Sequence, residues 1–333
     1  MPPHMLHNAK IQGVNMLLRR RNFIACAAAF AVARPAFAAA PLSVVTTTAM
    51  IADAVRQVGG SHVEVNALMG PGIDPHAYRQ TRTDLAALYR ADAVFWNGLY
   101  LEAQMEELLL DLARRKPTFA LGDDVPKDKL LAHEDYEGRF DPHIWMVPDL
   151  WVSVVESVRQ RLSDLRPAAA PDFAANAARH SEELARLQAY ANESLSQIPE
   201  ASRVLISAHD AFGYFGQAFG FDVMGIQGLS TQSEAGLNRI AELVDVIVTR
   251  DIKAVFVESS VSDRSMRALI EGAAARGHEL AIGGELFSDA MGQPGTYEAT
   301  YVGMIDHNVT VIASALGADV PTRGMNGLLS AGS

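Results

Sequence analysis

The chain has 333 residues, enough for about two domains, and 49% of them are apolar and 20% charged. This balance is typical of globular proteins and excludes an intrinsically disordered or collagen-like chain. The formal net charge is −11, and because residues 1–38 hold five basic side chains and no acidic one, the remainder carries −16. A surface of that sign repels phosphate backbones and attracts cations, so we expect no nucleic-acid partner.

Residues 1–38 have the pattern of a secretory signal peptide. Three arginines form a basic region, and Phe23–Ala33 is a short apolar run. A cleavage motif of small residues, Ala36-Phe37-Ala38, places the cut near Ala38. Met16 begins a tidier signal of the same kind, so a true start at Met16, with residues 1–15 an over-extension, stays open. General secretory and twin-arginine export are equally open. We expect the mature protein in the periplasm.

The single cysteine, Cys26, lies within this signal. It comes only a few residues after the arginines, before the apolar region is complete, so we expect no lipid anchor. Without Cys26 the mature chain forms no disulfide and offers no thiolate. Any metal site must then be built from His, Asp, Glu or water.

Strand and helix patterns alternate from Leu42 onward. In the first half the pattern predicts strands over 42–48, 63–69, 93–98 and 118–122, with helices over 50–58, 83–89 and 102–113. In the second half it predicts strands over 203–207, 222–226, 254–258 and 279–282, with helices over 212–219, 237–250, 265–276 and 296–316. Repeated βα units of this kind predict parallel sheets covered by helices.

The segment between these halves is different. Asp172–Ile198 contains neither Gly nor Pro, which predicts one helix of about 26 residues. The predicted fold class is therefore α/β, with two lobes that each hold a mainly parallel β-sheet flanked by helices, joined by one long rigid helix. We place the parts in chain order: N-terminal lobe 40–170, linking helix 171–199, C-terminal lobe 200–318 and flexible tail 319–333.

Four polar side chains lie just after predicted strands or in loops rich in Gly and Pro. His76 and His143 each end an Asp-Pro-His triplet, His209 follows the strand 203–207, and Asp289 follows the strand 279–282. Ligand-bearing residues collect at the carboxyl ends of strands in α/β sheets. Three imidazoles and one carboxylate suit a borderline divalent metal such as Zn²⁺ or Mn²⁺. On the pattern alone, four unrelated surface side chains remain the alternative.

Six ordered motifs resemble those of the zinc and manganese substrate-binding proteins of bacterial ABC transporters. They run from Gly72–Tyr78 through Asp141–Trp145, Ser207–Phe215, Gly225–Thr231 and Phe256–Ser260 to Gly283–Gly292. The resemblance implies that His76, His143, His209 and Asp289 are the metal ligands, two from each lobe. It also implies that one ion per chain is delivered to an inner-membrane ABC permease. The third ligand varies in this family, and the acidic segment 123–141 holds only His133, so the choice between Zn²⁺ and Mn²⁺ stays open.

A metal carrier is the function that we expect, with no catalytic residues, no small organic substrate and a monomeric chain. Deprotonated imidazoles are needed for binding, so affinity is expected to fall as pH drops through about 6.5. One alternative is a periplasmic zinc hydrolase, although the chain has no His-Glu-x-x-His motif and no assignable general base. Another is a siderophore-binding protein, which would need aromatic and basic residues in its cleft.

Several other polar residues have two interpretations. Asp74 and Asp141 either orient the histidines that follow them or cap turns, and Glu258 either faces the cleft or makes a hydrogen bond at the strand end. Five further histidines are expected to be structural or solvated: His62, His133, His180, His278 and His307.

Overall fold

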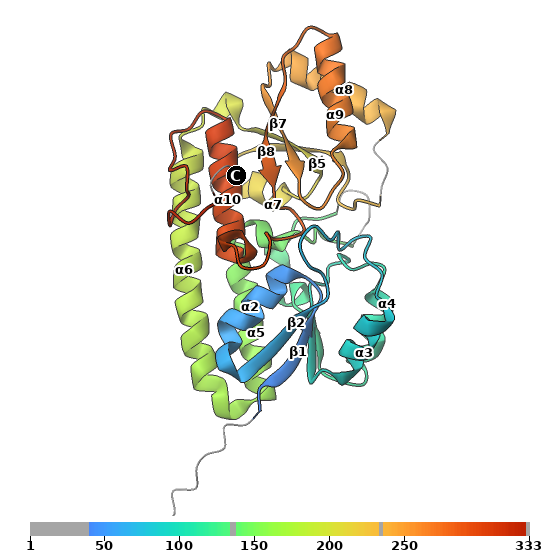
Figure 1. Cartoon of the computed structure of the whole chain (residues 1–333), viewed down its shortest axis with the longest axis vertical. Helices are drawn as coiled ribbons and strands as arrows, with labels where there is room; N and C mark the ends of the chain where they lie inside the picture. Colours follow the sequence, from blue (N-terminus) through green and yellow to red (C-terminus); the bar gives the residue numbers. More distant parts are fainter. Residues whose placement is uncertain (1–39, 134–137, 233–235, 331–333) are drawn as a thin grey trace, which may run out of the picture. The chain divides into compact units, whose positions relative to one another are not determined.

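The structure, a computed structural model, describes residues 40–133, 138–232 and 236–330 (Figure 1). The predicted signal peptide therefore lies outside the described residues. Residues Pro41–Ser333 form one compact unit. Within the described ranges no helix combines the length and the apolar character that a membrane span requires.

The N-terminal half contains a four-stranded sheet in the order β2-β1-β3-β4. Its strands are β1 (Leu42–Thr46), β2 (Val63–Ala67), β3 (Ala93–Trp96) and β4 (Thr118–Ala120). All pairs are parallel, and Val44 of β1 lies opposite Val65 on one side and Ala93 on the other. Parallel neighbours need crossover segments, here α2 (Ala49–Gly59), α3 (Arg82–Arg90) and α4 (Glu106–Ala113).

The C-terminal half holds two separate two-stranded parallel sheets. They pair β5 (Val204–His209) with β6 (Asp222–Gln227), and β7 (Ala254–Glu258) with β8 (Ala281–Leu286). The helices of this half are α7 (Gly213–Phe219), α8 (Leu237–Thr249), α9 (Arg264–Ala275) and α10 (Tyr301–Ala315). The predicted α/β class with parallel sheets is confirmed.

Strand β8 runs through two glycines at which the predicted strand ended. A Cβ atom at Gly284 would lie 2.4 Å from Cγ1 of Val311, on α10. Glycine therefore lets β8 continue in close contact with α10, and this contact leads the chain into the loop that carries Asp289.

The predicted long helix is confirmed as α6 (Ala170–Ser196), which has 27 residues. Along its length α6 packs against α2, α10 and a further helix, α5 (Pro148–Leu165) (Figure 1). Helix α5 is not among the helices predicted from the sequence. Its buried residues Val154, Val158 and Leu162 nevertheless recur at helical spacing, and Pro148 stands at its first position, where proline is tolerated.

One large hydrophobic core connects the two halves. It includes Val44 of β1, Trp151 of α5, Leu184 of α6 and Ile305 of α10. Two smaller clusters lie under α8 and α9 and around α3 and α4. Because the main core is continuous and close-packed, it fixes the elements of the two halves that lead into the site relative to each other.

The residues after α10 pack back onto this helix. The backbone N–H of Met325 donates to Asp306 Oδ1 at 2.9 Å, and Leu329 is fully buried. The lobe, linker and tail boundaries given above stay predictions.

Candidate metal centre

The two Asp-Pro-His triplets fold into the same local turn. Asp74 Oδ1 accepts a hydrogen bond from the backbone N–H of His76 at 2.8 Å, and Asp141 Oδ1 does the same for His143 at 2.9 Å. An aspartate that binds the backbone two residues ahead stabilises a tight turn, and the intervening proline fixes its own φ. The repeated triplet therefore sets the position at which each imidazole leaves the backbone.

The other two side chains come from the carboxyl ends of strands. His209 is the last residue of β5, and Asp289 lies in the loop that follows β8. Both positions agree with the rule that functional groups of α/β proteins gather beyond the carboxyl ends of their strands.

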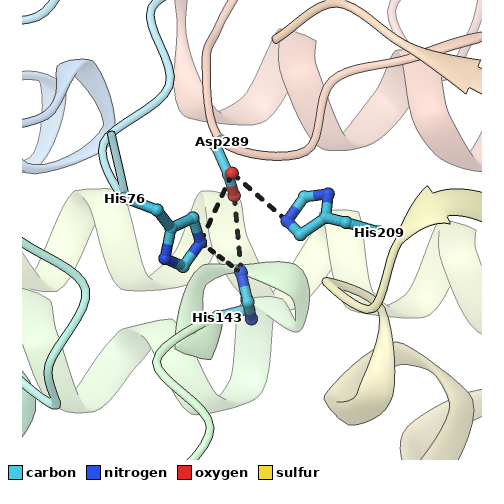
Figure 2. Close-up of side chains that lie close together, drawn as sticks. All are labelled: His76, His143, His209 and Asp289. Atoms are coloured by element: carbon cyan, nitrogen blue, oxygen red, sulfur yellow. Dashed lines mark hydrogen bonds and ion pairs between the residues drawn. The ribbon is translucent and has the colours of Figure 1, made fainter. Parts of the chain in front are cut away.

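All four side chains point toward one another, as Figure 2 shows, and each offers one atom of a group whose members lie within 4.8 Å of one another. Nε2 of His76 lies 3.3 Å from Nε2 of His143 and 3.6 Å from Oδ2 of Asp289. Nε2 of His143 lies 3.5 Å from Oδ1 of Asp289, and Nε2 of His209 lies 3.2 Å from Oδ2 of Asp289. The structure thus brings together all four residues that the sequence singled out.

These separations match the edges of a small coordination polyhedron. Zinc ligands lie at about 2.0–2.2 Å from the ion, so two ligands of a tetrahedral site are roughly 3.3–3.6 Å apart. The four separations given above, 3.2 to 3.6 Å, lie close to that range, and no separation in the set exceeds 4.8 Å. The arrangement has the size of a site for a single bare ion.

The donor atoms are buried, and several of them lack well-formed hydrogen bonds. Relative exposure is 3% for His76 and Asp289 and 0% for His143 and His209. Among the described residues, Nε2 of His209 and both carboxylate oxygens of Asp289 form no hydrogen bond of good geometry and face only the other members of the cluster. Buried polar atoms of this kind are rare in folded proteins, and a bound cation is one arrangement that satisfies them.

Two carboxylates hold the far sides of the imidazoles. Asp141 Oδ1 lies 2.7 Å from Nδ1 of His143, and Glu258 Oε2 lies 2.5 Å from Nδ1 of His209. A carboxylate that accepts from Nδ1–H fixes the tautomer in which Nε2 carries the free lone pair. Asp141 therefore both orients the ring of His143 and stabilises the turn. Asp74 stabilises its turn through the backbone N–H of His76 and makes no hydrogen bond to the His76 ring among the described residues.

Burial and charge act differently on the pKa values of His76 and His209. Burial lowers the pKa of His76 to about 3, although the charge of Asp289 opposes this effect. Burial also acts to lower the pKa of His209, but the charges of Glu258 and Asp289 outweigh it and raise the pKa well above the usual value. A cation that bound Nε2 of His209 would therefore have to displace a proton.

Asp289 is the acidic partner of these histidines. Its burial alone would raise the pKa of the carboxyl group, but the charges of His209, His76 and His143 outweigh burial and hold that pKa well below its usual range. Asp289 is therefore ionised and supplies a full negative charge to the centre.

These residues lie within the segment matched by a known family. The model of the family described as ZnuA, zinc-uptake complex component A periplasmic, matches residues 44–315. The chain belongs to this family. The resemblance that the sequence motifs indicated is thereby confirmed.

Two curated relatives of this ZnuA-family chain cover most of its length. The manganese-binding lipoprotein MntA of Bacillus subtilis (strain 168) is 47% identical over 276 residues, which cover 83% of this chain and 90% of the relative. The zinc-binding protein TroA of Treponema pallidum (strain Nichols) is 43% identical over 273 residues, which cover 82% of this chain and 88% of the relative.

A solved structure agrees with the fold. The periplasmic zinc-binding protein TroA from Treponema pallidum superposes with a TM-score of 0.81 at 43% identity, covering 83% of this chain and 99% of that one. This chain therefore has the same fold as a solved structure that is titled as a zinc-binding protein.

Other histidines of this ZnuA-family chain do not join the cluster. His180 and His307 are buried in α6 and α10, and His62 contacts Asp172 at 2.8 Å. Within the described ranges no second group of three or more His, Cys, Asp or Glu side chains is arranged to hold an ion.

Proposed function

We propose that this chain binds one Zn²⁺ or Mn²⁺ ion through His76, His143, His209 and Asp289 and delivers it to the permease of an ABC importer in the inner membrane. The observation that carries the proposal is the convergence of four buried donor atoms, all within 4.8 Å of one another, from four segments that are distant in the sequence. Membership in the zinc-uptake family supports it.

The proposal includes both ions, because the names of the relatives include both. The Bacillus subtilis relative is named as manganese-binding and the Treponema pallidum relative as zinc-binding. Imidazole suits zinc and carboxylate suits manganese, so a set of three imidazoles and one carboxylate accepts either ion.

The donor set favours a carrier over an enzyme. Four protein ligands complete a tetrahedral zinc site, whereas catalytic zinc keeps a position for water. Four contacts between the donor groups span 3.2 to 3.6 Å and the whole set lies within 4.8 Å, a spacing that fits a bare ion. We therefore propose neither the hydrolase nor the siderophore-binding protein.

The site of action follows from the predicted signal. We propose export to the periplasm with cleavage near Ala38, and the periplasmic family description supports this location. Relatives from Bacillus subtilis and Streptococcus mutans are named lipoproteins. For this chain the absence of a lipid anchor, the monomeric state and the division into lobes 40–170 and 200–318 linked through α6 remain part of the proposal.

Elemental analysis of the protein purified from its native compartment tests the proposal. We expect zinc or manganese at one ion per chain, and native mass spectrometry should give a mass increment equal to a bare ion. A chain that contains no stoichiometric transition metal and takes up none after chelator treatment would contradict the proposal. A larger increment would instead indicate a chelate.

A further inference from the structure

The loops that carry His143 and Asp289 are joined directly behind the ligands. The indole Nε1–H of Trp145 donates to the backbone carbonyl of Ser288 at 2.7 Å. Trp145 is two residues beyond His143, and Ser288 immediately precedes Asp289. This hydrogen bond therefore connects a ligand segment of the N-terminal half with a ligand segment of the C-terminal half.

Both ends of this hydrogen bond are buried. Trp145 and Ser288 have 0% relative exposure, and the ring centroids of Trp145 and His143 lie 5.3 Å apart. Because both groups are buried, water cannot take the place of the indole N–H. Loss of that N–H therefore leaves the Ser288 carbonyl without a hydrogen-bond donor from Trp145. The indole thus fixes the distance between the two ligand segments.

Trp145 and the residue that precedes Ser288 are also anchored to α10. The hydroxyl of Tyr301 donates to the carbonyl of Trp145 at 2.8 Å. The side-chain amide of Asn308 binds both backbone groups of Phe287, with Oδ1 accepting from its N–H at 2.9 Å and Nδ2 donating to its carbonyl at 2.7 Å. Helix α10 and Trp145 therefore hold the Asp289 loop from two sides.

We infer that Trp145 is a positioning residue that holds His143 and Asp289 as a preformed pair of ligands, and that this raises metal affinity and slows metal release. The inference rests on the proposed function. Its physical basis is pre-organisation: ligands that are already held near their bound separation lose less conformational freedom when the ion arrives. The 3.5 Å between Nε2 of His143 and Oδ1 of Asp289 is the separation being held.

Trp151 is a matched control in the same chain. It is fully buried, and its ring stacks on Tyr301 with centroids 5.3 Å apart and an interplanar angle of 9°. Its indole Nε1 has no hydrogen-bond partner among the described residues. A Trp→Phe change therefore removes the same atoms from a buried site at both positions, but removes a hydrogen bond only at Trp145.

The test compares Trp145→Phe with Trp151→Phe in the mature protein, using Zn²⁺ and Mn²⁺ as probes. Dissociation constants are measured by competition with a chelator, release rates by stopped flow, and the midpoint of unfolding, Tm, on the metal-free forms. We expect Trp145→Phe to weaken affinity about tenfold and to accelerate release by a similar factor. Trp151→Phe should stay within about threefold of the wild type, and both changes should lower the Tm.

The outcomes separate the inference from the proposed function. Equal affinities for the two variants would overturn the positioning role of Trp145 while leaving metal binding intact, whereas a wild-type protein that binds neither ion would overturn the proposed function. If Trp145→Phe does not fold, the benzothienyl analogue of tryptophan at position 145, which keeps the shape and lacks the N–H, gives the same comparison. Wild-type affinity in that analogue would also overturn the inference.

Discussion

Glu258 holds His209 through two hydrogen bonds. Its Oε2 accepts from the ring Nδ1–H at 2.5 Å, and its Oε1 accepts from the backbone N–H at 2.8 Å. His209 ends β5 and Glu258 ends β7, and the two strands are in contact. The strand ends thus place a buried negative charge on the side of the imidazole that faces away from Asp289.

We predict that Glu258→Gln weakens binding of Zn²⁺ and Mn²⁺ about tenfold or more. A carboxylate that accepts from Nδ1–H makes the imidazole a stronger donor, and removal of such a partner typically lowers metal affinity about 10- to 100-fold. The amide of glutamine retains the shape and one acceptor oxygen but lacks the charge. Competition titration with a chromogenic chelator measures the change.

Glu279→Gln is the matched control for this prediction, because Glu279 is an exposed glutamate in the same half of the chain. It removes one negative charge from the surface without contact to the centre, and we expect its affinity to equal that of the wild type. The same loss in both variants would show that overall charge, and not the contact with His209, determines affinity.

The sequence was sufficient to predict the four ligand candidates because each has a local signal. His76 and His143 each end the same Asp-Pro-His triplet, and His209 and Asp289 follow strand patterns that can be recognised in the sequence. Glu258 also ends a predicted strand, but its pairing with His209 has no local signal, since it lies 49 residues further along the chain and meets His209 through the contact of β5 with β7. The same holds for Trp145, whose bond to Ser288 spans 143 residues.

The fold was predicted least well where packing between distant elements overrides local pattern. The helix predicted over 102–113 begins only at Glu106, because Glu102 is buried and its carboxylate accepts from the hydroxyl of Thr47 and the backbone N–H of Asn97. The final helix begins at Tyr301, where the side chain of Thr300 caps it by accepting from Gly303 N–H. The contact of Glu102 with Thr47 joins segments far apart in the chain and has no periodic signal in the sequence, whereas the Thr300 cap is a local signal that the predicted boundary did not include.

The affinity for metal is predicted to fall as pH decreases, with the loss already present near neutral pH. Only the deprotonated imidazole binds an ion, so affinity is highest above the pKa of a ligand histidine and falls below it. The pKa of His209 lies well above its ordinary value of 6.5, whereas that of His76 is about 3. His209 therefore dominates the dependence between pH 6 and 8, and His76 contributes nothing in that range.

Calorimetry in buffers of different ionisation enthalpy measures this proton exchange. We expect close to one proton to be released for each ion bound at neutral pH, and the logarithm of the binding constant to change by about one for each pH unit below the pKa of His209. An affinity that is constant from pH 6 to 8 would contradict the assignment of a protonated His209 in the metal-free protein.

Removal of a ligand is predicted to weaken binding by at least tenfold in each of His76→Ala, His143→Ala and His209→Ala. An ion that binds only the folded state stabilises it by about 2.7 kcal/mol at 100 times its dissociation constant, so these variants should also lose the metal-dependent rise in Tm. His180→Ala is the control, because His180 is buried in α6 outside the cluster. Equal loss of affinity in all four variants would contradict the ligand assignment.

A side-chain hydrogen bond links the loop of His76 to the C-terminal half and can be removed without a change of shape. The hydroxyl of Thr231 donates to Oδ2 of Asp74 at 2.6 Å, while the other oxygen of Asp74 accepts from the backbone of His76. Loss of a half-buried hydrogen bond to a charged group weakens an interaction by about 1 kcal/mol, roughly fivefold in an equilibrium constant. We therefore predict that Thr231→Val weakens metal binding about fivefold and accelerates release, as measured by stopped-flow chelation. Thr231→Ser keeps the hydroxyl and should retain wild-type rates, so identical behaviour of the valine and serine variants would show that this hydrogen bond does not hold His76 in place.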